Sequence, residues 1–225
     1  MIVPAPNPAQ VRDACLAELA HLGLPVPPGN LPLLWDPADG VSLRPSVEIE
    51  ARMAILNVVL ARAYGMPSDL AVSWLRDAHL MERLTGAEWD FVVSGVGDPE
   101  VFALHFDALF ALAWLVGIAM DLDPTRPAAE GLVGRLPHLP ENEPFADWRR
   151  RTLAAPREPS AAAVQLDLHY CLDWAFLEAE YRQSPLPGPI DSNAIGQRRW
   201  ALEWAVLRHG QRHGPPRAWN EIDLS

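Results

Sequence analysis

The chain has 225 residues, and 49% of them are hydrophobic, so it can build a sizeable core and is not globally disordered. Its 29 acidic and 18 basic residues give a formal net charge of −11, which disfavours nucleic acid as a partner. The longest basic run is only Arg149-Arg150-Arg151, and the most apolar stretch, residues 108–120, is too short to span a bilayer.

The start of the chain shows no secretory signal pattern, and its two cysteines, Cys15 and Cys171, lie in helical patterns with apolar neighbours. Buried, reduced thiols are typical of a reducing compartment. We therefore predict a cytoplasmic protein that binds neither nucleic acid nor a membrane.

Proline separates the periodic segments, and helix-capping residues mark where they begin. Asn7-Pro8 opens the first predicted helix, Ser46 and Ser68 are expected to cap the next two, and Thr85 with Glu88 forms a capping box. The predicted helices cover residues 8–22, 46–64, 68–79, 85–94, 98–120, 128–135, 160–182 and 192–209.

Two proline-rich connectors, residues 24–45 and 121–159, separate groups of helices. The tail at 219–225 alternates apolar and polar residues, which fits a short strand or an extended clasp. The fold class predicted is all-α, or mainly α: a single compact multi-helix domain over residues 1–225.

Several short motifs occur in a fixed order along the chain: LR at 43–44, a helix with Glu48, Ile49 and Arg52, DLHY at 167–170, DWA at 173–175, RRWALEW at 198–204 and WNEID at 219–223. This order resembles the bacterial family of uncharacterised proteins called domain of unknown function 4272, over roughly residues 31–224. Gln197 and Asn220 stand where that family usually has glutamate and aspartate. The resemblance implies a helical fold and no particular reaction.

The candidate catalytic residues are His105, Asp107, His169 and Asp173, because polar groups on apolar helices are costly unless they are paired or functional. His169 and Asp173 are four residues apart and share a helix face. The alternative is structural: His169 pairs locally and Asp167 tethers a loop amide. Neither a Glu-x-x-His pair nor a paired-cysteine motif occurs, so we predict no metal and no cofactor.

The candidate binding residues fall into two groups. Arg198, Arg199 and Glu203 could bind a phosphate or carboxylate, or could simply hold helices together. Trp35 and Trp148 lie in the connectors, where each either plugs a groove of the fold or anchors an interface.

Two functional hypotheses remain open. The leading one is a non-enzymatic binding protein, of the kind in which an immunity protein or antitoxin holds a basic partner. It is based on the net charge, the lack of nucleophile or phosphate-loop motifs, and the connector tryptophans. The alternative is an enzyme or small-molecule binder with a polar site between helices, built from His105, Asp107, His169 and Asp173. Convergence of these side chains on one pocket would favour the second. The oligomeric state stays open.

Overall fold

The computed structural model describes residues 1–128, 131–152 and 155–224, and they are mainly helical, as predicted. Nine α-helices occur in the described part: α1 (Pro8–His21), α2 (Ser46–Ala63), α3 (Ser68–Asp77), α4 (Gly86–Ser94), α5 (Pro99–Ala103), α6 (His105–Leu115), α7 (Phe145–Thr152), α8 (Pro159–Tyr181) and α9 (Ser192–Ala205). The described part also contains three short strands, β1 (Val3–Pro4), β2 (Gly40–Leu43) and β3 (Val206–His209). Single-turn 3₁₀ helices occur at Met81–Arg83, Val133–Arg135, Leu139–Glu141 and Trp219–Glu221.

The chain forms two compact units, each assembled from separate stretches of sequence. The sheet unit consists of Met1–Arg44, Leu122–Pro127 and Arg157–Ser225, and the helical unit of Pro45–Asp121 and Ala128–Pro156. The organisation as one domain stays a prediction. None of the described helices combines the length and apolar character that crossing a membrane requires.

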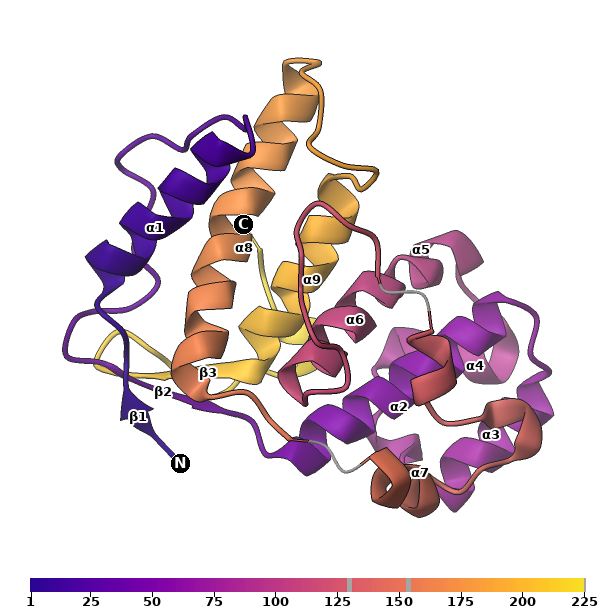
Figure 1. The fold of residues 1–225 in the computed structure, drawn as a ribbon. Helices are drawn as coiled ribbons and strands as arrows, with labels where there is room; N and C mark the ends of the chain where they lie inside the picture. Colours follow the sequence, from indigo (N-terminus) through magenta and orange to yellow (C-terminus); the bar gives the residue numbers. More distant parts are fainter. Residues whose placement is uncertain (129–130, 153–154, 225) are drawn as a thin grey trace. The chain divides into compact units, whose positions relative to one another are not determined.

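The sheet unit packs three helices around a small antiparallel sheet with the strand order β1-β2-β3. Helix α8 contacts β2, and both α1 and α9 pack along α8 (Figure 1). The helix α1 begins as predicted, because Asn7 Oδ1 accepts the main-chain N–H groups of Ala9 and Gln10 at 3.1 and 3.2 Å. Cys15 and Cys171 are buried thiols that form no disulfide, and burial raises the pKa of both.

The sheet itself was not predicted, and its last strand corrects the predicted end of the final helix. Helix α9 stops at Ala205, whose carbonyl oxygen accepts the main-chain N–H of Arg44 at 2.9 Å. The next four residues then pair with β2, Val206 opposite Leu43 and His209 opposite Gly40. Residues 206–209 are therefore a strand, because a partner distant in sequence completes their hydrogen bonds. The predicted extended tail instead begins with the 3₁₀ turn Trp219–Glu221.

The helical unit is organised around α2, which contacts α3, α4, α5 and α6. Its core is a cluster of fully buried apolar side chains that includes Ile55, Val58 and Leu75. The capping box of α4 is confirmed, since Glu88 N–H donates to Thr85 Oγ1 and Thr85 N–H donates to Glu88 Oε2. These two bonds satisfy N–H groups that the first helical turn leaves unpaired.

Other helix ends in this unit differ from the prediction. Pro45 and Pro67 occupy the N-cap positions, and the predicted caps Ser46 and Ser68 are the first helical residues instead. The predicted helix 98–120 is two helices, α5 and α6, and α6 ends before Gly117, whose φ of +79° requires glycine-like freedom.

The second proline-rich connector contains a helix that was not predicted, α7. The helix predicted at 128–135 falls partly outside the described residues, since 129 and 130 are not described, and a single 3₁₀ turn is seen at Val133–Arg135.

Candidate functional site

The four candidate catalytic residues do not share a unit. His105 and Asp107 lie on α6 of the helical unit, whereas His169 and Asp173 lie on α8 of the sheet unit. Neither unit by itself brings all four together. The described residues also contain no group of three or more His, Cys, Asp or Glu side chains placed to hold a metal ion.

His169 is a core residue. Its side chain is fully buried, and Nδ1 donates to the main-chain oxygen of Gln165 at 2.9 Å. Burial lowers the pKa of His169 to about 4, so the imidazole is neutral near pH 7. Its Nε2 has no hydrogen-bond partner among the described residues. Asp173, one turn further along α8, instead accepts a hydrogen bond from Arg199 Nη1 at 2.5 Å.

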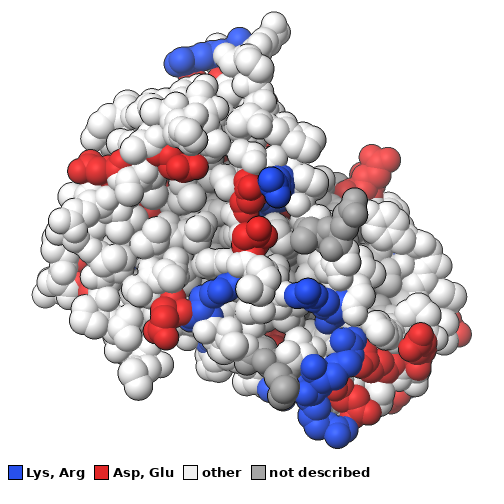
Figure 2. Space-filling model, in the orientation of Figure 1, with Lys and Arg blue, Asp and Glu red and all other residues white. Residues whose placement is uncertain are grey.

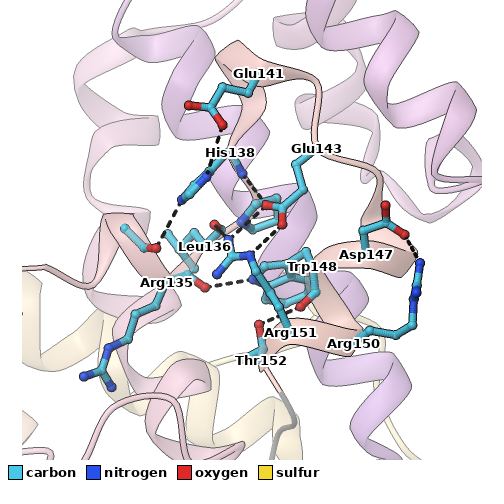
Figure 3. Close-up of polar contacts among 12 residues, drawn as sticks. Arg135, Leu136, His138, Glu141, Glu143, Asp147, Trp148, Arg150, Arg151 and Thr152 are labelled. Atoms are coloured by element: carbon cyan, nitrogen blue, oxygen red, sulfur yellow. Dashed lines mark hydrogen bonds and ion pairs between the residues drawn. The ribbon is translucent and has the colours of Figure 1, made fainter.

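The two connector tryptophans are buried inside their own units. Trp35 is 1% exposed, and its indole N–H donates to the carbonyl oxygen of Pro6 at 2.7 Å. Trp148 is also 1% exposed, and its indole N–H donates to the carbonyl oxygen of Arg135 at 2.8 Å (Figure 3). Both indoles act as plugs of the fold, and neither presents a surface to a partner.

The basic run on α7 is balanced by carboxylates. Arg149 pairs with Glu50, Arg150 with Asp147 and Arg151 with Glu143. Around α7, basic and acidic side chains lie interleaved on the surface (Figure 2). The hydrogen bond from Arg151 lowers the pKa of Glu143 to about 2, which keeps this carboxylate charged (Figure 3).

Arg198 connects segments of the sheet unit. Its side chain is fully buried, with Nη1 donating to the carbonyl oxygen of Asp123 and Nη2 to that of Arg126, both at 2.8 Å. These bonds attach the segment Leu122–Pro127 to α9. Of the two readings for Arg198, these contacts support the one in which it holds the fold together.

Arg199 and Glu203 line a groove of about 680 Å³ that lies entirely within the sheet unit. Its other walls come from elements that the sequence did not connect. They are Arg44 after β2, Tyr170 of α8, Trp204 of α9, all four residues of β3, residues 33–34 of the first connector, and residues 213–217 and 222–223 of the tail. The size falls in the range typical of ligand sites, about 300–1,000 Å³.

Positive charge outweighs negative charge along this groove, although the chain as a whole is acidic. Four arginines line it, against two carboxylates, Glu203 and Asp223; the arginines are Arg44, Arg199, Arg208 and Arg217. Arg208 pairs with Glu203 at 2.8 Å. Arg217 is exposed and has no ion-pair partner in the part of the chain that the structure describes.

Arg44 and Arg199 are held rigidly by their surroundings. Arg44 donates through Nε to the carbonyl oxygen of Trp204 at 2.7 Å and through Nη2 to that of Arg217 at 2.5 Å. Its guanidinium also lies over the Trp204 ring, 4.5 Å from the ring centre. These contacts fix the orientation of the guanidinium in the groove wall.

Tyr170 connects the groove to the interior of the unit. Its ring centre lies 4.7 Å from the guanidinium carbon of Arg199 and 5.5 Å from that of Arg12. Burial raises the pKa of Tyr170, so the phenol stays neutral near pH 7. A neutral aromatic ring against a guanidinium adds a cation–π contact, which further restricts Arg199.

Two histidines, His209 of β3 and His213 of the tail, form hydrogen bonds with residues in and before β2. His213 Nε2 contacts Asp39 Oδ2 at 3.0 Å, and His209 Nε2 contacts Ser42 Oγ at 2.8 Å. Asp39 also accepts the main-chain N–H of Asp36, and this hydrogen bond lowers the pKa of Asp39. These contacts place tail residues along the groove.

Sequence reasoning named Arg199 and Glu203 but missed most of the groove. Apart from Tyr170 of α8 and Trp204 of α9, its remaining residues lie in connectors, the tail or a strand whose spatial positions depend on long-range pairing. Arg44 and Tyr170 both belong to the short motifs noted in the sequence, and those motifs were the one signal that could have grouped them with Arg199.

Fold and groove together define a mainly helical protein with a three-stranded sheet and an arginine-lined groove. The chain belongs to the family described as "Domain of unknown function (DUF4272)", whose family model matches residues 12–222. The match begins in α1, earlier than the predicted residue 31, and it includes every groove residue except Asp223. No curated protein and no solved structure matches the chain.

Proposed function

We propose that this protein is a non-enzymatic binding protein that holds an anionic ligand in the groove of the sheet unit. The observation that carries the proposal is the concentration of four arginines on one groove of a chain with a net charge of −11. Arginine presents a planar fork of N–H donors that matches a carboxylate or phosphate group.

Preorganisation supports this function. Asp173, the carbonyl oxygen of Leu224 and the Tyr170 ring all contact Arg199. Two carbonyl oxygens and an indole ring hold Arg44 in the same way. When side chains are already held in position, binding does not have to order them. The entropy loss on binding is therefore smaller, and the binding free energy is more favourable.

The groove favours a ligand of the opposite sign to the basic partner predicted from the overall charge. At physiological salt the Debye length is about 8 Å, so a ligand inside the groove responds mainly to the charges lining it. The two connector tryptophans, which also supported the basic-partner hypothesis, are buried. We therefore prefer an anionic ligand, and we propose the cytoplasm as the compartment, which suits two thiols that form no disulfide.

The test is a citrate titration of ¹⁵N-labelled protein at low salt, followed by NMR of the arginine Nε–H and tryptophan indole signals. We expect saturable chemical-shift changes at the groove arginines. Arg217→Gln should weaken the affinity for citrate about tenfold, because one charge-assisted contact is lost. Arg212→Gln is the matched control, since Arg212 is also exposed but pairs with Asp36 and does not line the groove.

Salt provides a second criterion. The shifts should weaken strongly at about 0.5 M NaCl, where the Debye length is only a few ångströms. The proposal fails if citrate leaves the groove signals unchanged at low salt, or if Arg217→Gln and Arg212→Gln weaken binding equally.

A further inference from the structure

The groove contains an open sheet edge. The strand order is β1-β2-β3, so β3 has a partner on only one side among the described residues. All four residues of β3, Val206 to His209, line the groove. The opposite edge, β1, is only two residues long and ends in Pro4, which has no N–H to offer.

The register shows which main-chain groups of β3 face away from β2. In an antiparallel ladder, hydrogen-bonded and non-hydrogen-bonded pairs alternate. The hydrogen bond from Arg44 N–H to the carbonyl oxygen of Ala205 shows that these two residues form a hydrogen-bonded pair. Every second pair along the ladder is of the same kind, so the main-chain N–H and C=O groups of Leu207 and His209 also face β2. Arg208 therefore directs its N–H and C=O outward, and Val206 directs its C=O outward.

These outward groups have no hydrogen-bond partner in the described part of the chain. An unpaired strand edge is a template on which an extended chain can add as a further strand, with main-chain bonds giving affinity and side-chain contacts giving specificity. Four residues of strand span about 14 Å, so a segment of four or five residues would pair along β3.

Charge complementarity identifies the occupant. Together with Arg208, which pairs with Glu203, the groove presents Arg199 and Trp204 of α9, and the tail contributes Arg217. In an added strand, alternate side chains face the same side. Acidic side chains at every second position would therefore lie along this row of guanidiniums.

We propose that the ligand of the groove is an extended acidic peptide segment of another protein, which adds to the free edge of β3. This rests on the proposed function, because it names the class of anion that the groove binds. The peptide supplies the carboxylates, and the outward N–H and C=O of Arg208 supply the main-chain pairing that a small anion cannot use.

The probe is an acetylated and amidated pentapeptide, Glu-Val-Glu-Val-Glu, and binding is measured by calorimetry and by the amide signal of Arg208 in NMR. Two further versions carry N-methyl groups, one on the glutamates and one on the valines. The N-methyl groups remove hydrogen-bond donors from one side of the peptide strand at a time and leave its charge unchanged. Because only one side faces β3, we expect one version to lose about tenfold in affinity while the other binds as the parent does.

Protein variants separate the side chain from the backbone. Arg208→Ala removes the guanidinium only, and we expect weaker binding that still responds to N-methylation of the peptide. Arg208→Pro removes the outward N–H as well, and we expect a further loss. If Arg208→Pro does not fold, the N-methyl series on the wild-type protein still decides the question.

The other outcomes are distinct. If citrate and the peptide bind but both N-methyl versions behave alike, the strand addition is wrong and the anion-binding function stands. If neither citrate nor the peptide binds, both proposals are wrong. If sedimentation shows a homodimer in which the Arg208 amide is protected from exchange, a second copy of the chain occupies the edge and the inference is overturned.

Discussion

Arg12 and Asp167 lie 155 residues apart in the sequence and form a two-bonded ion pair, with Nε–Oδ2 and Nη2–Oδ1 distances of 3.0 and 2.7 Å. The side chains are only 9% and 3% exposed. The same guanidinium donates to the carbonyl oxygens of Leu31 and Pro32. One buried arginine thus joins α1, α8 and the first connector of the sheet unit.

Breaking this pair should destabilise the protein strongly. We expect Arg12→Met or Asp167→Asn to lower the free energy of unfolding by roughly 3–5 kcal/mol, because each leaves a buried partner uncompensated. The double variant should cost less than the sum of the two, since the second change removes the orphaned group. Urea unfolding followed by circular dichroism measures all three, and additive losses would show that the two residues are not coupled.

His169 should make stability depend on pH. Its pKa is lowered from 6.5 to about 4 in the folded chain, so between these values the unfolded chain binds a proton that the folded chain does not. The free energy of unfolding should therefore fall by roughly 1.4 kcal/mol per pH unit as the pH drops through this window.

Variants at two histidines test this account. His169→Phe removes the titrating group and should flatten the pH dependence of stability between about pH 6.5 and 5. His21→Gln changes an exposed histidine and should leave the slope as it is. An unchanged slope in His169→Phe would refute the assignment.

The Glu143–Arg151 pair should also make stability fall as the pH drops, but in a lower pH window than His169. The pKa of Glu143 is lowered from 4.5 to about 2, so the stabilisation is present above pH 4.5 and is lost as the pH falls toward 2. Arg151→Gln should cost about 1 kcal/mol near pH 7, a modest value because the Arg151 side chain is 37% exposed and screened by solvent. Arg150→Gln, whose pair with Asp147 is more exposed, should cost less in the same denaturation assay.

Two left-handed residues at helix ends should tolerate glycine. His79 follows α3 with a φ of 56°, and Gln183 follows α8 with a φ of 55°. Each lies at a position after a helix where glycine is favoured. We therefore expect His79→Gly and Gln183→Gly each to raise the free energy of unfolding by about 0.5–1 kcal/mol, and with it the melting temperature. Gly65→Ala and Gly23→Ala, at positive-φ positions with no atom near the added Cβ, should lower it. A lower melting temperature in both His79→Gly and Gln183→Gly would contradict this expectation.

Local signals in the sequence predicted the helices well. Helices α1, α4 and α8 begin at or within a residue of the predicted position, since Asn7, Thr85 with Glu88, and the proline before Ser160 act on neighbouring residues. The prediction was wrong for residues 206–209, because the partner that makes them a strand lies about 160 residues earlier in the chain.

The sequence by itself therefore determined the mainly helical fold and the family, because helix hydrogen bonds, caps and periodicity all act within a few residues. Only the tertiary structure decided which polar residues would form a site. His169 and Trp35 became core residues, while Arg44, Tyr170 and Arg199 met in one groove. The cause is long-range pairing. Strand pairs and buried ion pairs join segments far apart along the chain, so no local sequence pattern predicts which segments meet.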